Sequence, residues 1–199
     1  PAASIVLATG GRVRPLPVDG ADLSGVHFLR TIDDVLAFRD RLKPNTKLAI
    51  VGGGYIGLEV AAVATKLGCA VTVLEMTNRV LNRVAAPVVS DFYTRVHREA
   101  GVDIRTDVTV SGFEGDTTVK QVVCTDGSRI DTDVVIIGIG IIPNVELAEA
   151  AGLAVENGIT VDAMTRTSAE TVYAVGDCTN HPNDLLGRRL RLESVQNAL

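Results

Sequence analysis

Three glycines in the first half of the chain have the spacing of a dinucleotide-binding turn. Gly52, Gly54 and Gly57 follow the pattern G-x-G-x-x-G. In such a turn the first glycine adopts backbone angles that other residues avoid, the second lets the main chain approach a pyrophosphate, and the third lets the next helix pack closely on the strand. The helix then presents free N–H groups and the positive end of its dipole, which favour a phosphate without a cationic side chain.

An acidic residue stands where such a turn needs one. Glu75 follows Gly52 by twenty-three positions, close to the interval at which dinucleotide folds place an acid against the ribose hydroxyls. Its carboxylate can accept hydrogen bonds from both adenosine-ribose hydroxyls and would repel a ribose phosphate, so the sequence predicts NAD rather than NADP. Arg79 weighs against that preference, because an arginine near the acid can serve a phosphate.

The surrounding pattern supplies the elements that must position these residues. The apolar run 48–51 suits a buried parallel strand, and 70–74 suits the next one. Helical spacing between them predicts one buried helix face, formed by Ile56, Val60, Val63, Ala64 and Leu67. Gly68 stands where a left-handed residue ends a helix. The glycines alone fit a turn in some other α/β protein, whereas strand, turn, helix, strand and acid together predict a dinucleotide site.

The flanking segments complete an α/β pattern. Thr31 and Asp34 predict a capping box that begins a helix before Pro44. A second amphipathic helix is marked by Val88, Val89, Phe92 and Val96. The later segments predict a parallel strand at 103–105, an antiparallel meander through 108–113 and 119–124, and a final parallel strand at 133–138. The carboxyl end of that last strand should lie near the glycine turn.

Composition excludes several classes of protein. Of the 199 residues, 46% are apolar and only 4% aromatic, which suits an aliphatic core of parallel strands. A formal net charge of −5 argues against non-specific nucleic-acid binding. Cys69, Cys124 and Cys178 have no metal-binding spacing, so we expect buried thiols and no metal site. The chain shows neither a signal peptide nor a membrane-spanning run, and a cytoplasmic location is the expectation.

Three further segments carry a resemblance. They are LATGG at 7–11, DVVIIGIGIIPN at 133–144 and TSAETVYAVGDC at 167–178. Together they resemble the FAD- and NAD-dependent pyridine nucleotide reductases. The resemblance implies an α/β fold in which a Rossmann-like NAD-binding domain, with a parallel sheet and an antiparallel meander, is inserted into a partial FAD-binding domain of the glutathione-reductase type. The expected domains are 12–139 for NAD, and 1–11 with 140–199 for FAD.

Four further sequence segments resemble one group within that family. The segments GGRVRPLPV, AIVGGGYIGLEVAA, REAGVDIRT and RLESVQNAL are similar to the ferredoxin reductases of bacterial cytochrome P450 and ring-hydroxylating systems. The resemblance implies an enzyme that passes electrons from NADH through FAD to a 2Fe-2S ferredoxin. The family's first G-x-G-x-x-G and its C-terminal domain are absent, so we expect a fragment that retains FAD weakly or not at all and is inactive alone.

The resemblance also implies roles for individual residues. Thr9, Gly10 and Arg14 should lie by FAD, Asp177 should bond a ribityl hydroxyl, and Val195 should touch the flavin through its backbone. Glu59 should accept a hydrogen bond from the nicotinamide carboxamide and so orient the ring for hydride transfer; its other reading is a solvated helix carboxylate favoured by the dipole. The expected NAD-binding residues are Gly52, Gly53, Gly54, Tyr55, Ile56, Gly57, Glu59, Glu75, Gly138, Ile139 and Gly140.

Two alternatives and one partner surface follow from the same resemblance. A related flavoprotein could pass electrons elsewhere, as an NADH oxidase or a disulfide reductase, although the absence of a CxxC between Lys47 and Gly140 argues against the thioredoxin-reductase arrangement. The other alternative is a redox-poor NADH-binding module resembling apoptosis-inducing factor. Arg188, Arg189 and Arg191 would help to receive an acidic ferredoxin or would form a solvated loop.

Overall fold

The computed structural model describes residues 3–198, which form two compact units. One unit is the central segment Val13–Gly140, and the other combines the chain up to Arg12 with the chain from Ile141 onward. The central segment carries the glycine turn and Glu75. Each unit is described by itself below.

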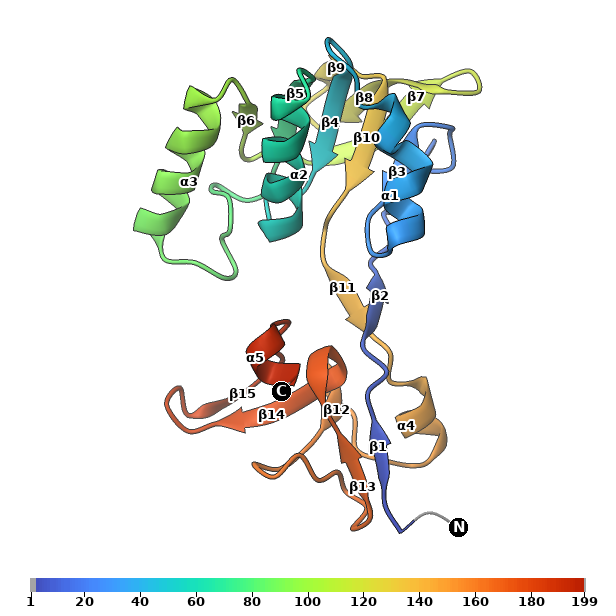
Figure 1. Ribbon diagram of the computed structural model, residues 1–199, viewed down its shortest axis with the longest axis vertical. Coiled ribbons are helices and arrows are strands. Elements are labelled where there is room, and N and C mark those ends of the chain that lie inside the picture. Colours follow the sequence, from blue (N-terminus) through green and yellow to red (C-terminus); the bar gives the residue numbers. More distant parts are fainter. Residues whose placement is uncertain (1–2, 199) are drawn as a thin grey trace. The chain divides into compact units, whose positions relative to one another are not determined.

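The central unit is built on a parallel sheet of five strands in the order β3-β10-β4-β5-β6 (Figure 1). The strands are β3 (Val26–Phe28), β10 (Val134–Ile137), β4 (Lys47–Val51), β5 (Ala70–Leu74) and β6 (Asp103–Arg105). Every neighbouring pair is parallel. β4 and β10 are apolar at nearly every position because both of their faces are covered.

Alternate residues of the central strands enter two different cores. Leu48 and Ile50 pack with apolar residues of α2 (Tyr55–Lys66) and β5, whereas Ala49 and Val51 pack with the meander. The meander consists of β7 (Val110–Gly115), β8 (Val119–Cys124) and β9 (Arg129–Asp131). Helices therefore cover one face of the sheet and the antiparallel strands cover the other.

The remaining helices of this unit begin and end close to the expected residues. They are α1 (Ile32–Phe38), which continues as a 3-10 turn η1 (Arg39–Arg41), and α3 (Pro87–Glu99). The capping box is confirmed, because the side chains and backbone of Thr31 and Asp34 bond each other reciprocally. Gly68 has a φ of 84°, which confirms the left-handed end of α2.

The buried face predicted for α2 is confirmed only in part: Ala64 is fully buried and Val60 packs against the core, but the other three positions are exposed. The helix buries Gly57, Leu58, Ala61 and Ala64. Ile56, Val63 and Leu67 are 38%, 56% and 46% exposed. Close packing on the sheet favours glycine and alanine beside Leu58 on the inner face, and Ile56, Val63 and Leu67 lie outside it. The apolar positions predicted for α3 are likewise exposed, since that helix buries Ser90 and His97.

The sequence analysis missed several strands. β3 is only three residues long and lies within a segment that carried no strand signal. The segments β2 (Gly11–Val13) and β11 (Ile141–Pro143), which pair with each other, were also missed. Such short strands are defined by the partner they pair with and not by their own periodicity.

The other unit contains two small sheets and one compact core. β1 (Ile5–Leu7) pairs in parallel with β13 (Val172–Ala174), and β12 (Ile159–Thr160) pairs with β14 (Thr179–Asn183), which forms a hairpin with β15 (Arg188–Leu190). The short helices are α4 (Glu146–Ala150) and α5 (Val195–Ala198). The core consists of Ala148, Ile159, Val161, Ala174 and Cys178. Within residues 3–198, no helix has the length and apolar character needed to cross a membrane.

Candidate functional site

The glycine turn joins the end of β4 to the start of α2. The lack of a side chain has a different consequence at each of its glycines. Gly52 has a φ of 110°, and a Cβ there would overlap the carbonyl oxygen of Gly138. A Cβ on Gly57 would overlap the carbonyl oxygen of Gly52, so the helix could not pack as closely on the strand. Gly54 has no atom within 4 Å of a Cβ position, which leaves open space in front of the helix N-terminus. That open space fits a phosphate approaching the backbone.

The carboxylate of Glu75 is hydrogen-bonded to the backbone of the glycine turn. Its Oε2 accepts a hydrogen bond of 2.7 Å from the N–H of Gly53, and its Oε1 accepts one of 2.9 Å from the N–H of Thr77. The hydroxyl of Thr77 lies 2.7 Å from the same Oε1. Because each carboxylate oxygen has two lone pairs, Oε1 is filled by the two Thr77 contacts and Oε2 keeps one acceptor position for a ribose hydroxyl. The contribution of Thr77 was missed, and its position two residues after the acid was the only signal in the sequence.

Arg79 is committed to its own loop. Its guanidinium donates to the carbonyl oxygens of Ala85 and Asn82 at 2.9 and 3.0 Å, and to the hydroxyl of buried Ser90 at 2.7 Å. A side chain held by three such bonds is not available for a ribose phosphate. Arg79 is therefore no reason to expect NADP in place of NAD.

Tyr55, Ile56 and Glu59 are exposed on one side of α2. Gly54 is the N-cap, so Glu59 is the fifth residue of the helix and lies beyond its first turn. The dipole acts mainly within the first turn, so it gives little reason for an acid at this position. A solvated carboxylate favoured by the dipole is therefore a weaker explanation of Glu59 than the sequence analysis allowed.

The segment Gly138–Gly140 lies beside the glycine turn. The N–H of Gly138 donates to the carbonyl oxygen of Val51 at 2.8 Å, and the carbonyl oxygen of Gly140 accepts from the N–H of Arg14 at 3.0 Å. Gly138 and Gly140 have no side chain and Ile139 packs into the core with the meander, so backbone lines this edge of the sheet. The carboxyl ends of β4 and β10 are where open α/β sheets bind ligands.

In the other unit, the residues expected to hold FAD follow two paired strands. Leu7 is in register with Ala174, so Thr9 and Gly10 leave the same edge of the β1–β13 pair as Gly176 and Asp177. Gly10 and Gly176 have φ values of 60° and 79°. Asp177 lies in a single 3-10 turn, η2 (Gly176–Cys178). An acid at the carboxyl end of parallel strands, next to a sharp glycine turn, fits a polyhydroxyl ligand.

Asn144 fixes the Thr9–Gly10 segment and was missed by the sequence analysis. Its Nδ2 donates to the carbonyl oxygen of Thr9 at 2.9 Å, its carbonyl oxygen accepts from the Thr9 hydroxyl at 2.6 Å, and its N–H donates to Gly10 at 2.9 Å. Arg12 in turn donates to Asn144 Oδ1 at 2.8 Å. Only the spacing I-I-P-N after the last parallel strand marked this residue.

The last two predicted FAD residues are placed differently. Val195 begins α5 and is 69% exposed, while the side chain of Asn197 in the same helix donates to the carbonyl oxygen of Gly176 at 3.2 Å. α5 therefore lies against the turn that carries Asp177. Arg14 belongs to the central unit, whereas Thr9, Gly10, Asp177 and Val195 belong to the other.

The three arginines considered for a partner surface have different environments. Arg189 donates to the carbonyl oxygens of Val161 and Asn180, and so joins β15 to its neighbours. Arg191 pairs with Glu193 at 2.7 Å. Arg188 is exposed. The alternative of a solvated loop is wrong for Arg188 and Arg189, which lie in β15, whereas Arg191 follows that strand.

Histidines and cysteines form no metal centre among residues 3–198. All three cysteines are buried and free. His97 is only 7% exposed, and burial lowers its pKa.

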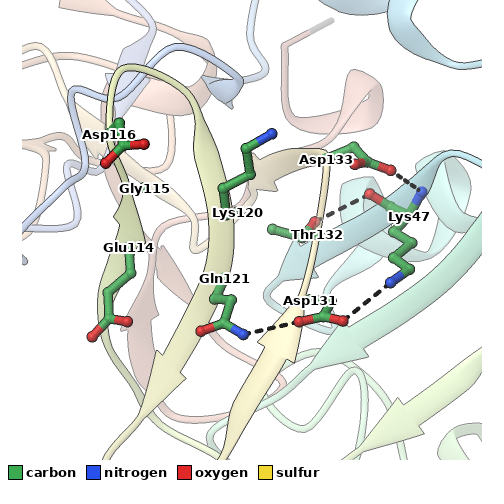
Figure 2. Close-up of a pocket in the computed structure, with 9 residues that line it drawn as sticks. All are labelled: Lys47, Glu114, Gly115, Asp116, Lys120, Gln121, Asp131, Thr132 and Asp133. Carbon is green, nitrogen blue, oxygen red and sulfur yellow. Dashed lines mark hydrogen bonds and ion pairs between the residues drawn. The ribbon is translucent and has the colours of Figure 1, made fainter.

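A pocket lies at the amino end of β4, whereas the glycine turn follows its carboxyl end. Figure 2 shows the residues that line this pocket. Lys47 at the start of β4 donates through its N–H to Asp133 at 2.9 Å and through Nζ to Asp131 at 3.1 Å. Gln121 also donates to Asp131 at 2.9 Å, and this bond, followed by Lys47, lowers the pKa of that carboxyl. The lining carries two lysines, Lys47 and Lys120, against four carboxylates, Glu114, Asp116, Asp131 and Asp133, so its formal charge is negative.

Comparisons with known proteins agree with this arrangement. The chain is 51% identical to putidaredoxin reductase CamA from Pseudomonas putida and 44% identical to the ferredoxin–NAD(+) reductase component of the anthranilate 1,2-dioxygenase system from Burkholderia cepacia. Each match covers 98% of this chain and 48% of the relative. A solved covalent complex of putidaredoxin reductase with putidaredoxin matches with a TM-score of 0.93 at 51% identity, over 98% of this chain and 48% of that one.

The chain therefore spans about half the length of the curated relatives it matches. The family profile of the pyridine nucleotide-disulphide oxidoreductases matches residues 1–199. On these grounds, together with the glycine turn and the parallel sheet that carries it, the chain belongs to the pyridine nucleotide-disulphide oxidoreductase family.

Proposed function

We propose that this chain is the NADH-binding part, with a portion of the FAD-binding part, of an NADH-dependent ferredoxin reductase. The observation that carries the proposal is the turn between β4 and α2, in which an open Gly54 faces the helix N-terminus and Glu75 is held 2.7 Å from the backbone of Gly53. The similarity to putidaredoxin reductase and to the ferredoxin–NAD(+) reductase component of a dioxygenase system supports ferredoxin as the electron acceptor.

The central unit would hold NADH through backbone and one carboxylate. The N–H groups at the start of α2 would bind the pyrophosphate, and Glu75 would accept from an adenosine-ribose hydroxyl. Tyr55 and Ile56 would lie against the nicotinamide, and Glu59 would accept from its carboxamide and fix the orientation of the ring. The backbone of Gly138–Gly140 would line the ligand along the carboxyl ends of β4 and β10.

The other unit would contribute to FAD. Thr9, Gly10, Asp177 and the backbone of Val195 would contact it, with Asp177 accepting from a ribityl hydroxyl. When bound, FAD supplies the step between a two-electron donor and a one-electron acceptor. The protein would supply binding and orientation, and hydride transfer to a flavin needs no nucleophile from the protein.

The electron acceptor would be a 2Fe-2S ferredoxin of an oxygenase system. Of the three arginines near the β14–β15 hairpin, only Arg188 extends without a bonding partner among residues 3–198 and so offers its charge to an acidic protein. We place the reaction in the cytoplasm, where buried free thiols and a net charge of −5 are ordinary.

Two measurements test the proposal. Calorimetric titration of the 199-residue chain with NADH and NADPH should show tighter binding of NADH. The full-length protein that carries this chain, supplied with FAD and NADH, should reduce a 2Fe-2S ferredoxin faster than it reduces oxygen. Turnover with oxygen alone would point to an NADH oxidase, and the absence of NADH binding would remove the proposal.

A further inference from the structure

The loop between β5 and α3 is fixed to the glycine turn. The N–H of Leu81 donates to the carbonyl oxygen of Gly53 at 2.9 Å. Leu81 is buried and has a φ of 54°, a conformation that few leucines adopt, so its position is determined by these contacts. Val80 is fully buried, with a methyl group 3.0 Å from where a Cβ on Gly53 would lie. The loop therefore keeps a defined position relative to the turn.

Arg83 extends from this loop onto the edge that carries the glycine turn. A Cβ on Gly140 would lie 3.1 Å from Nη2 of Arg83, so the guanidinium rests on the backbone of Gly140. Gly140 has a φ of 101°, and glycine therefore satisfies both the backbone angle and the close approach of the arginine. The guanidinium is thereby placed on the segment that continues from Gly138, which adjoins Gly52.

Arg83 also differs from its neighbours in its bonding. Among residues 3–198, its guanidinium makes no hydrogen bond or ion pair, and the side chain is exposed. Arg79 of the same loop makes three hydrogen bonds, and Arg105 at the end of β6 pairs with Asp103 at 2.8 Å. One cation of this edge is thus left with all five donors available.

We propose that Arg83 donates a pair of hydrogen bonds to the pyrophosphate of the bound dinucleotide. The inference rests on the proposed function, because it needs a dinucleotide in the glycine turn. A guanidinium matches two phosphate oxygens in one plane, and a loop already fixed by Leu81 and Arg79 loses little freedom when Arg83 binds. The N–H groups of a helix N-terminus can bind a phosphate without a cationic side chain, and in this chain Arg83 adds one from a separate loop.

The pyrophosphate is favoured over a ribose phosphate by the position of Glu75. Its carboxylate is held in the turn by Gly53 and Thr77, so a phosphate on the neighbouring ribose would meet a fixed negative charge. Arg83 instead lies over Gly140, on the segment that adjoins the first glycine. This separates the cation from the acid and assigns the two to different parts of one ligand.

Calorimetric titration of the chain with ADP-ribose, NADH, NADPH and adenosine tests the assignment. Arg83→Gln should weaken ADP-ribose and NADH by the same factor, roughly tenfold for a lost charge-assisted pair, and leave adenosine unchanged. The affinity of Arg83→Lys for ADP-ribose and NADH should lie between those of Arg83→Gln and the unchanged chain, because lysine keeps the charge but cannot donate the planar pair of hydrogen bonds. The loss should shrink as salt is raised. Arg95→Gln removes an exposed charge on α3 that pairs with Glu99, and it should change no affinity.

Two results would overturn the inference while leaving the proposed function intact. One is an unchanged affinity of Arg83→Gln for ADP-ribose. The other is a larger loss for NADPH than for NADH, which would assign Arg83 to a ribose phosphate. If the unchanged chain bound neither ADP-ribose nor NADH, the proposed function itself would fail and the inference with it. Circular dichroism of each variant separates a binding loss from unfolding.

Discussion

The carboxylate of Glu75 accepts a hydrogen bond of 2.7 Å from the backbone N–H of Gly53. The acid expected to choose between two nucleotides is therefore also a support of the turn that would hold either of them. Substitution of Glu75 consequently changes two properties at once, and a measurement of cofactor preference has to be read together with a measurement of stability.

Replacing Glu75 by alanine should lower both stability and NADH affinity. The N–H of Gly53 loses its acceptor, and the free energy of unfolding should fall by about 1–3 kcal/mol. Addition of a nearby arginine to this variant should move the preference toward NADPH. Urea denaturation and calorimetric titration measure the two effects. Glu75→Gln is the matched control, since it keeps an acceptor oxygen for one of the bonds; unchanged preference in the arginine variant would exclude Glu75 from nucleotide selection.

Substitution by alanine should affect stability differently at Gly57 and at Gly54. Gly57→Ala forces a methyl group onto the carbonyl oxygen of Gly52 and should cost about 1–3 kcal/mol of stability. Gly54→Ala enters open space at a φ of −80°, so stability should stay within about 0.5 kcal/mol.

The methyl group of Gly54→Ala should instead obstruct the pyrophosphate and weaken NADH by roughly tenfold, equivalent to about 1.4 kcal/mol. Thermal unfolding and NADH titration of both variants check the pair. If Gly54→Ala bound NADH as tightly as the unchanged chain, the phosphate would not approach the backbone at this glycine.

Stability should decline as pH falls below about 6.5, before carboxyl groups protonate. Burial lowers the pKa of His97, and burial followed by the charge of Arg41 lowers the pKa of His27. Both histidines stay neutral in the folded chain but take up a proton on unfolding, so their contribution is fully present above the unfolded pKa and is lost as pH falls through the folded pKa.

Urea denaturation between pH 7 and pH 5 measures this decline, and His97→Gln should flatten it. Several carboxyl groups, including Asp34 and Asp131, have a lowered pKa and lose their contribution only below about pH 4. These carboxyl groups therefore do not contribute to the decline in stability between pH 7 and pH 5. A slope unchanged in His97→Gln would show that His27 alone is responsible.

Arg189 and Arg188 are adjacent and should behave differently. Arg189→Ala removes donors to the carbonyl oxygens of Val161 and Asn180 and should cost about 1 kcal/mol. Arg188→Ala should leave stability unchanged. If the hairpin receives an acidic ferredoxin, Arg188→Ala should raise the Michaelis constant for ferredoxin at low salt more than at high salt. Equal effects on stability would contradict the different environments of the two side chains.

The sequence alone was enough for the local features of the dinucleotide site. Gly52, Gly57 and Gly68 were identified because each is required by a backbone angle or a close approach, which a side chain of any other type would prevent. The capping box at Thr31 and Asp34 was equally visible, since its bonds join residues three positions apart. Features that depend on neighbours in sequence leave their mark in the sequence.

Only the tertiary structure decided which surfaces meet. It buried Ala61 of α2 and exposed Val63 and Leu67, because the distance between helix and sheet, and not hydrophobicity alone, selects the inner residues. It also distinguished Arg79, whose guanidinium bonds groups of its own loop, from Arg83, which lies over Gly140 with no bonding partner in the described part of the chain. Two arginines four positions apart are equivalent in a sequence, and only the partners brought to them by distant segments make one structural and the other available to a ligand.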